Sequence, residues 1–336
     1  MQLREWLHLL RKETQLSKEN NLKASNKIST VASIGGGPIG AGWAAHFLAK
    51  GLKVKCYLHS KDEIDDYRAL IETAWETLEK LGINENASIE NMQIYTDLKK
   101  SLTDVDFVQE SIPEILKVKQ EFYSKIDTFL RPDVIIASST SGLLISEIVK
   151  NCSTKDRAIV GHPFNPPYLL PLVEVVASEY TDKAYIDQAV NFYTAFGKVP
   201  IVLKKEIPGF IATRLQEALW REALHMVAND EATPEQIDLA LINGPAPRMA
   251  YQGQCMAFHV ACGEGGMATN LDQFGPALKL PWTRLKAPEL SQELRDKMVI
   301  GCKEMSRGKH FLEMAKDRDN AIAAILNAIK NNHPND

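Results

Sequence analysis

The sequence Ile28-Ser-Thr-Val-Ala-Ser-Ile-Gly-Gly-Gly-Pro-Ile-Gly-Ala-Gly42 joins a run typical of a buried strand to a glycine-rich turn. Residues 28–34 are mainly apolar and β-branched, as expected of such a strand. An apolar segment at residues 43–50 follows the turn, and Gly51 marks the end of the helix that we expect there. This stretch therefore predicts a strand, a turn and a helix in that order.

The glycines of the turn have the spacing G-x-G-x-x-G, which in this context indicates a site for a dinucleotide. Gly35 permits the tight turn, Gly37 lets the backbone approach a pyrophosphate, and Gly40 lets the helix pack closely on the strand. The first amides of a helix have no partner within it and attract phosphate. We therefore expect the cofactor to bind at Gly35, Gly36, Gly37, Pro38, Ile39 and Gly40.

Strand and helix patterns alternate along the chain after this turn. Strands are predicted at residues 53–58, 103–111, 134–138, 158–160 and 172–176. The alternation predicts an α/β fold with a doubly wound, Rossmann-type parallel sheet, whose ligands lie at the carboxyl ends of the strands. From Pro208 onward the pattern is helical, which predicts an all-α C-terminal domain. We expect an N-terminal helical extension at residues 1–28, a dinucleotide-binding domain at 29–206 and the helical domain at 207–336.

The end of the second predicted strand departs from the usual dinucleotide pattern. An Asp or Glu normally stands there and binds the adenosine ribose, whereas this chain has Leu58. Asp62 or Glu63 are candidates to replace that acid from the following loop. Alternatively, His59 and Lys61 would accept the 2′-phosphate of NADP. We expect NAD as the cofactor, with NADP as the alternative.

Two predicted strands each carry one ionisable residue beside a proline-rich turn. His162 follows the strand at residues 158–160, and Glu174 lies in the middle of Leu-Val-Glu-Val-Val176, which is apolar on both faces. A carboxylate in a buried strand requires a cation or a strong donor. We expect Glu174 to hold one imidazole nitrogen of His162, leaving the other as a positioned base. The alternative is a solvent-facing Glu beside a turn His.

Other polar side chains stand at the predicted strand ends or just beyond them, namely Glu110, Glu114, Ser139 and Ser141. Ser141 has two interpretations: it caps a helix, or it directs its hydroxyl at the reacting atoms.

The composition excludes several classes of protein. The net charge of -4 provides no basic field for nucleic acid or an anionic membrane, and no apolar run has membrane-spanning length. Five scattered cysteines without a CxxC pair suit reduced thiols in a cytoplasmic protein.

Cys255, His259 and Cys262 share one helical face, but no fourth ligand accompanies them, so we expect packing rather than a metal site.

Five motifs together resemble the 3-hydroxyacyl-CoA dehydrogenase superfamily. They are the glycine turn at residues 35–40, Pro113-Glu-Ile-Leu-Lys-Val-Lys119, Ser138-Ser-Thr-Ser141, Gly161-His-Pro-Phe-Asn165 with Glu174, and Pro208-Gly-Phe-Ile-Ala-Thr-Arg214. The resemblance implies that His162 is the catalytic base, Glu174 its orienting partner and Ser141 a donor to the substrate oxygen. It also places Glu114, Lys119 and Asn165 near the nicotinamide half of NAD, and suggests a homodimer through the C-terminal helices.

Within the superfamily, the segments at residues 161–176, 217–224 and 273–282 are similar to members that oxidise L-carnitine. The expected reaction is the NAD-dependent oxidation of the 3-hydroxyl of a small 3-hydroxy acid. Phe164 and Tyr168 offer aromatic faces to a quaternary ammonium group. Thr213 stands where acyl-CoA enzymes have a substrate-binding Asn. The alternatives are a 3-hydroxyacyl-CoA, L-gulonate, or an NAD-binding protein without activity. Residues 61–100 carry ten carboxylates against five Lys or Arg, which disfavours the phosphates of CoA.

Overall fold

The computed structural model describes residues 28–250, 253–262, 264, 266–276, 280–283, 291–294, 296, 307–309 and 311–332. Of the expected N-terminal extension at residues 1–28, residues 1–27 lie outside these ranges. The chain divides into two compact units between Thr213 and Arg214, somewhat after the boundary at residue 206 that the sequence suggests. The intervening segment belongs with the sheet because Phe210 is fully buried in the hydrophobic core of the first unit.

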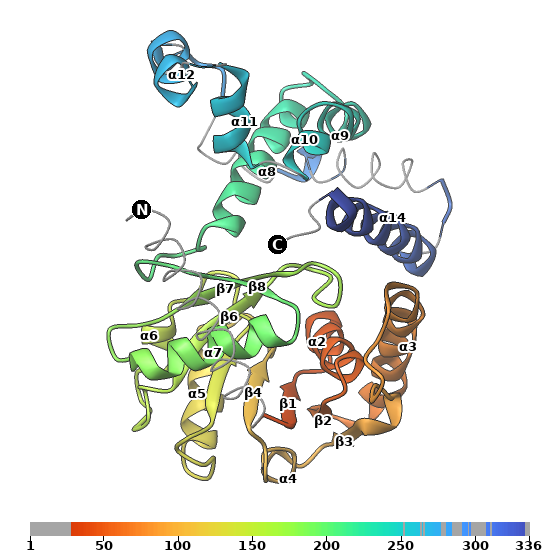
Figure 1. Cartoon of the computed structure of the whole chain (residues 1–336), viewed down its shortest axis with the longest axis vertical. Coiled ribbons are helices and arrows are strands. Elements are labelled where there is room, and N and C mark those ends of the chain that lie inside the picture. The colour runs from red at the N-terminus through yellow and green to blue at the C-terminus, as the bar shows by residue number, and fades with distance from the viewer. Residues whose placement is uncertain are drawn as a thin grey trace, which may run out of the picture. The chain divides into compact units, whose positions relative to one another are not determined.

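The first unit is built on one sheet, with strand order β3-β2-β1-β4-β5-β6-β7-β8 among the described residues (Figure 1). The chain order reverses between β1 and β4, so the carboxyl ends of these two strands form the crevice where such folds bind ligands. The strands are β1 (Thr30–Ile34), β2 (Lys53–Tyr57), β3 (Met92–Tyr95), β4 (Phe107–Glu110), β5 (Ile135–Ser138), β6 (Ala158–Pro163), β7 (Leu172–Val176) and β8 (Val199–Val202).

The predicted doubly wound α/β fold is confirmed, except that two of the predicted strands pair antiparallel rather than parallel. β6 and β7 are antiparallel, whereas every other neighbouring pair is parallel. A parallel pair needs a crossover of a dozen or more residues, and the segment between β6 and β7 is too short for one. The short connection therefore forces the chain to turn back beside β6.

Helices cover both faces of the sheet. One hydrophobic cluster contains Val31, Phe107 and side chains of α2, α3 and α7, while a second contains Ala32, Val108 and side chains of α5 and α6. Neighbouring residues of each strand thus enter opposite clusters, as the alternation of side chains in a strand requires. The helical segments are α2 (Pro38–Ala49), η1 (Lys61–Glu63), α3 (Ile64–Leu81), η2 (Ile89–Asn91), α4 (Leu98–Ser101), α5 (Leu116–Ile126), α6 (Ile145–Ile148) and α7 (Lys183–Ala195).

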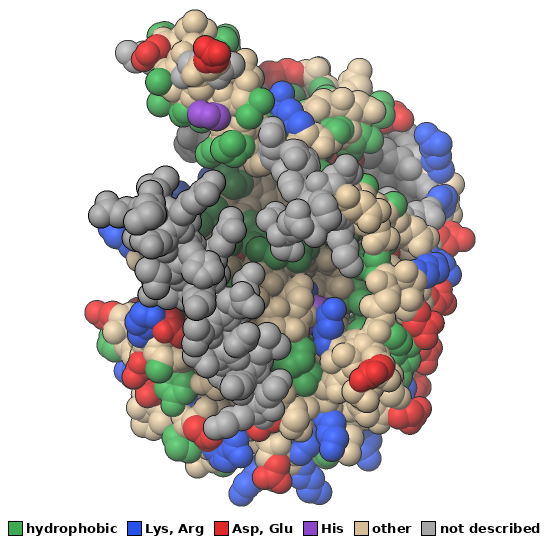
Figure 2. Space-filling model, viewed as in Figure 1, with side chains coloured by type: hydrophobic (Ala, Val, Ile, Leu, Met, Phe, Trp, Pro, Cys, Tyr) green, Lys and Arg blue, Asp and Glu red, His purple; other side chains and the backbone are tan. Residues whose placement is uncertain are grey.

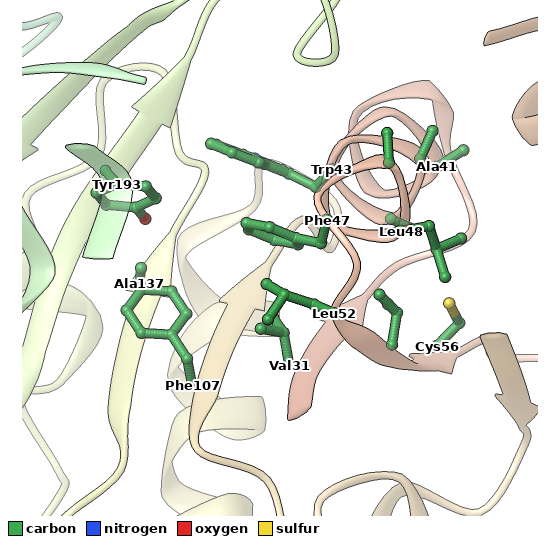
Figure 3. Close-up of a cluster of buried hydrophobic side chains, with 14 of the residues drawn as sticks. Val31, Ala41, Trp43, Phe47, Leu48, Leu52, Cys56, Phe107, Ala137 and Tyr193 are labelled. Atoms are coloured by element: carbon green, nitrogen blue, oxygen red, sulfur yellow. The ribbon is translucent and has the colours of Figure 1, made fainter. Parts of the chain in front are cut away.

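Helix α2 is buried along nearly its whole length, which fixes the glycine turn at its start. Trp43 stacks on Phe47 with ring centroids 5.2 Å apart, and Phe47 contacts Phe192 at 5.6 Å. Figure 3 shows these α2 side chains directed toward Phe107 and Tyr193. A helix that is apolar on all sides is stable only in a core, so packing holds α2 and the turn together.

All the regular secondary structure described in the second unit is helical, as predicted. Its helices are α8 (Ala212–Ala228), which starts at the unit boundary, α9 (Pro234–Asn243), α10 (Pro245–Met249), α11 (Gln254–Ala261), α12 (Gly266–Phe274) and α14 (Phe311–Asn332). Among the described residues, no helix combines the length and apolar character needed to cross a membrane.

Candidate active site

His162 and Glu174 face each other on the antiparallel strands β6 and β7. The register pairs the two residues directly, and His162 Nδ1 lies 2.8 Å from Glu174 Oε2. Glu174 is fully buried and His162 is 5% exposed. The predicted contact is therefore confirmed, and the alternative of a solvent-facing Glu174 is wrong.

The other carboxylate oxygen of Glu174 is held by the start of α8. Glu174 Oε1 accepts hydrogen bonds from the backbone N–H groups of Ile211 at 2.8 Å and Ala212 at 2.9 Å. Burial alone would raise the pKa of Glu174, but the hydrogen bonds from His162 and from these two amides outweigh it and lower the pKa. Glu174 therefore stays ionised, so His162 Nδ1 must be the donor in their hydrogen bond.

The His162 ring also contacts two aromatic side chains. The ring centroid of Phe164 is 5.5 Å away and that of Phe210 is 5.6 Å away. Nε2 has no hydrogen-bond partner among the described residues. With Nδ1 protonated, a neutral His162 presents the Nε2 lone pair as a base.

A buried ion pair lies at the ends of β4 and β5. Lys119 is 1% exposed, and its Nζ donates to Glu110 Oε1 at 2.6 Å and to the Ile112 carbonyl at 3.2 Å. Glu110 is fully buried and also accepts hydrogen bonds from Ser138 Oγ at 2.6 Å and the Ile112 amide at 2.7 Å. Lys119 is therefore enclosed by acceptors of its own chain, and sequence reasoning did not identify Glu110 as its partner.

Glu114 links this ion pair to the loop that carries Ser141. Its Oε2 is 3.6 Å from Lys119 Nζ, while its Oε1 accepts hydrogen bonds from Thr140 Oγ1 at 2.6 Å and from the Ser141 amide at 2.8 Å. Ser141 is exposed, and its hydroxyl has no partner among the described residues. Helix α6 begins at residue 145 with Leu144 as its N-cap, so the interpretation of Ser141 as a helix cap is wrong.

The Ser141 loop contacts the turn before α8. The Gly209 amide donates to the Gly142 carbonyl at 3.4 Å, and a Cβ atom on Gly142 would lie 3.3 Å from the Gly209 nitrogen. The same turn carries Phe210 and leads to the amides that hold Glu174. One turn therefore contacts both the Ser141 loop and the pair of His162 and Glu174.

The segment between β6 and β7 packs against α2. A Cβ atom on Gly42 would lie 2.8 Å from Pro167 Cδ and 3.4 Å from Tyr168 Cδ1, so only glycine permits this approach. Lys198 Nζ donates to the carbonyls of Pro167 and Leu170, the latter at 3.1 Å, and lies 4.9 Å from the Trp43 ring centroid. These contacts, which sequence reasoning missed, fix the segment that carries half-buried Phe164 and Tyr168 and exposed Asn165.

The glycine turn has the geometry expected of a pyrophosphate site. Gly35 has φ +121°, and a Cβ atom on Gly40 would lie 2.1 Å from the Gly35 carbonyl oxygen. A Cβ atom on Gly37 would meet nothing within 4 Å among the described residues, so this backbone is open to a ligand. No described side chain caps the start of α2 at Gly37 either. The free amides and the open backbone fit a bound pyrophosphate.

A cavity of about 750 Å³ adjoins the glycine turn. It is lined by Gly35, Gly36, Gly37, Tyr57, His59, Glu63, Asp66, Ser111, Ile112, Pro113, Val118 and Phe122. Its walls come from the ends of β1, β2 and β4, which is where a doubly wound fold binds the adenosine half of a dinucleotide. Leu58, at the position of the usual acid, is fully buried and does not line the cavity.

Two further groups of residues singled out in the sequence are Thr213 and the helical face of Cys255, His259 and Cys262, on which the sequence predicts packing. Thr213 is half-buried in the first turn of α8, at the end of the first unit. His259 Nδ1 accepts the Met267 amide at 3.0 Å, and Asn270 contacts Cys262 Sγ at 3.7 Å. Within the part of the chain that the structure describes, no cluster of three His, Cys, Asp or Glu side chains has the geometry to hold a metal ion.

Comparison with known proteins agrees with this geometry. Residues 30–207 match the 3-hydroxyacyl-CoA dehydrogenase NAD binding domain, and residues 209–308 match the C-terminal domain of the same family. The chain belongs to the 3-hydroxyacyl-CoA dehydrogenase family. Like its relatives in this family of NAD-dependent oxidoreductases, it has NAD as its cofactor, and the glycine turn, the open Gly37 backbone and the adjoining cavity fit that cofactor.

Relatives within the family cover almost the whole chain. The L-carnitine dehydrogenase of Nocardiopsis dassonvillei is 49% identical over 312 residues, covering 93% of this chain and 95% of that protein. The L-carnitine dehydrogenase of Streptomyces coelicolor is 47% identical over 307 residues, covering 91% and 96%. Among solved structures, the NAD+-dependent 5-formyl-3-hydroxy-2-methylpyridine 4-carboxylic acid 5-dehydrogenase is similar with a TM-score of 0.75 at 25% identity, covering 90% of this chain and 99% of that one.

Proposed function

We propose that this member of the 3-hydroxyacyl-CoA dehydrogenase family oxidises the 3-hydroxyl group of L-carnitine to the ketone 3-dehydrocarnitine, with NAD as the hydride acceptor. The observation that carries the substrate assignment is the 49% identity to an L-carnitine dehydrogenase over 93% of the chain. The buried pair of His162 and Glu174 at 2.8 Å supports the chemistry, because oxidation of an alcohol needs a base at the hydroxyl.

His162 acts on the hydroxyl proton. Its Nε2 accepts that proton as the C3–O bond becomes a carbonyl, and the proton later passes to solvent. When bound, NAD accepts the hydride that leaves C3. Glu174 keeps Nδ1 protonated throughout and stabilises the imidazolium that forms, because its charge lies 2.8 Å from the ring nitrogen.

The remaining polar groups position the reactants. The Ser141 hydroxyl donates a hydrogen bond to the substrate oxygen, and Glu114 fixes its loop through the Ser141 amide at 2.8 Å. Glu114 and Asn165 contact the nicotinamide half of the cofactor. Lys119 is 1% exposed, and it contributes by holding Glu110 and Glu114 in place through its ion pairs with them.

The substrate's quaternary ammonium group is assigned to the aromatic faces of Phe164 and Tyr168. Phe164 is half-buried beside the His162 ring at 5.5 Å, and Lys198 fixes the segment that carries both residues. Thr213 contributes to the same substrate site from the first turn of α8.

The runner-up substrate is a 3-hydroxyacyl-CoA, such as 3-hydroxybutyryl-CoA, which the same pair of residues would oxidise. L-Gulonate oxidation and an inactive NAD-binding protein are further alternatives. Carboxylates on η1 and the first turn of α3 (Asp62, Glu63, Asp65 and Asp66) disfavour CoA, because they repel its phosphates. Figure 2 shows acidic side chains along the edge of the molecule where Figure 1 places α3.

A substrate panel tests the proposal. L-Carnitine, L-gulonate and 3-hydroxybutyryl-CoA are each assayed with NAD and with NADP, and NADH or NADPH is followed by absorbance. We expect kcat/KM to be higher for L-carnitine with NAD than for any other combination of substrate and cofactor. Higher kcat/KM on the acyl-CoA would replace the substrate assignment, and NAD binding without turnover on any of the three would favour the inactive protein.

We also propose that the protein is a cytoplasmic homodimer formed through the C-terminal helices. Large apolar side chains are exposed on all six described helices of the second unit, including Leu215 at 66% on α8, Val260 at 54% on α11 and Phe274 at 58% on α12. Figure 2 shows hydrophobic side chains on the surface in the region that Figure 1 labels α11 and α12. Burial of such a surface against a second copy stabilises a dimer. Light scattering after gel filtration tests this, and a monomeric mass would contradict it.

A further inference from the structure

The residue at the end of β2 cannot bind the adenosine ribose of NAD. In a dinucleotide fold this position normally carries an acid that accepts hydrogen bonds from the ribose hydroxyls. Here Leu58 is fully buried among the hydrophobic side chains of α2 and α3. The acceptor for the ribose must therefore come from another element.

Glu63 brings a carboxylate to the glycine turn from outside β2. It ends η1, immediately before α3, and its Oε2 would lie 2.2 Å from a Cβ atom placed on Gly36. The same Cβ atom would lie 3.4 Å from Leu58 Cδ2. The Glu63 carboxylate thus lies over the backbone of the turn's second glycine, beside the side chain that replaces the usual acid.

The neighbouring acid Asp62 has a different environment. The Ser60 hydroxyl donates to Asp62 Oδ2 at 3.2 Å, and Ser60 also accepts the Asp62 amide as the N-cap of η1. Glu63 lines the cavity of about 750 Å³ beside the glycine turn, and Asp62 does not. Of the two candidates in this loop, only Glu63 faces the cofactor cavity.

The charges around this cavity oppose a 2′-phosphate. Glu63 and Asp66 both line it, and no Lys or Arg does so among the described residues. Of the lining residues that the structure describes, His59 is the one basic side chain, and Lys61 is not among them. A phosphate monoester adds a charge of roughly −1.5 to −2 near pH 7. Two carboxylates without a guanidinium or ammonium group would repel it.

We propose that Glu63 is the ribose-binding acid of this chain and determines its preference for NAD over NADP. Its ionised carboxylate accepts hydrogen bonds from the 2′- and 3′-hydroxyl groups of the adenosine ribose. NADP lacks the 2′-hydroxyl donor and places a phosphate against this carboxylate. The function of the strand-end acid has thus moved five residues along the chain, from position 58 to position 63.

The test is calorimetric titration of the full-length protein with NAD+ and with NADP+, without substrate. Glu63→Gln keeps the size of the side chain and removes its charge. We expect Kd for NAD+ to rise about 10- to 100-fold, because a hydrogen bond to a charged acceptor is lost, while Kd for NADP+ stays the same or falls. Asp62→Asn is the matched control, and its two Kd values should stay within about twofold of wild type, as for a surface substitution.

Three outcomes would overturn the proposal. An equal loss of affinity for both dinucleotides would mean that Glu63 only supports the glycine turn. Two unchanged Kd values in Glu63→Gln, or a loss of NAD+ affinity in Asp62→Asn instead, would place the acid elsewhere. Thermal unfolding of each variant confirms that it is folded, and Glu63→Ser provides a smaller side chain with the same expected change in ratio. Because no substrate is present, the result does not depend on the proposed oxidation of L-carnitine.

Discussion

Glu174 Oε2 lies 2.8 Å from His162 Nδ1, while the opposite oxygen of the same carboxylate accepts two backbone amides at 2.8 and 2.9 Å. The carboxylate is thus held from both sides, by a strand-borne imidazole and by the first amides of α8. A base that keeps its proton on one ring nitrogen and offers the lone pair of the other to a substrate needs this kind of fixed partner. The position and tautomer of the His162 ring therefore depend on both sets of contacts.

Two glycines of the turn should respond differently to the same substitution. Gly37→Ala places a methyl group where nothing lies within 4 Å, so the free energy of unfolding should be unchanged within about 1 kcal/mol, as for a helix-terminal glycine. The methyl group would nevertheless occupy the approach of the pyrophosphate, so Kd for NAD should rise at least tenfold, by roughly 1.4 kcal/mol or more. In Gly40→Ala the added atom would lie 2.1 Å from the Gly35 oxygen, so stability should also fall. Urea unfolding and NAD titration of both variants test this, and equal stability losses would contradict it.

Removal of the buried ammonium group should destabilise the fold. Lys119→Met leaves Glu110 buried without its cation, and breaking a buried ion pair costs about 3–5 kcal/mol. Lys117→Met on the same helix is the control, because Lys117 and Glu121 form an exposed pair at 4.0 Å. Its loss should cost less than about 1 kcal/mol. Urea unfolding of both variants measures the difference, and similar midpoints would argue against a charged pair at Lys119.

Ser141→Ala should reduce turnover and spare cofactor binding. The hydroxyl is exposed and free of partners among the described residues, so its removal should not affect folding. We expect kcat to fall about 10- to 100-fold, the cost of one hydrogen bond to a developing charge. Ser88→Ala, at the N-cap of η2 near the opposite ends of the strands, is the control. An unchanged kcat in Ser141→Ala would exclude Ser141 from the reaction.

Asp127 should make stability depend on pH in acid. Burial raises its pKa, but hydrogen bonds from the hydroxyls and amides of Ser153 and Thr154 outweigh this and lower the pKa from 3.8 to about 2. An acid whose folded pKa is depressed stabilises the fold above its unfolded pKa, and this contribution is lost as pH falls from about 4 toward 2. The free energy of unfolding of Asp127→Asn should therefore be about 2 kcal/mol below that of wild type at pH 7, and this difference should become smaller below pH 4. A difference in the free energy of unfolding that is constant with pH would contradict this.

The sequence predicts those parts of the fold that depend on local patterns. The glycine turn, the strand that ends at His162 and the apolar strand around Glu174 can be recognised because side-chain period and turn residues are local properties. The short strands β3 and β8 were not predicted. Their residues are only partly buried, and β8 contains Pro200, which an edge strand tolerates because its outer side has no ladder.

The missed contacts join residues that are distant in sequence. The amides on Glu174 lie 37 and 38 positions further along the chain, and Lys198 reaches a carbonyl 31 positions back. Gly42 gives no local signal for its role, because its packing against Pro167 appears only when the segment between β6 and β7 folds over α2. Such contacts follow from the arrangement of the whole unit rather than from any single pattern.

The central claim is that Glu174 keeps His162 ready to accept the hydroxyl proton. Glu174→Gln preserves the shape of the side chain and removes the charge that fixes the imidazole tautomer. The decisive measurement is kcat for L-carnitine oxidation by this variant, with Kd for NAD measured beside it. We predict that kcat falls roughly 100-fold or more, while Kd for NAD stays close to wild type. A wild-type kcat in Glu174→Gln would contradict the account.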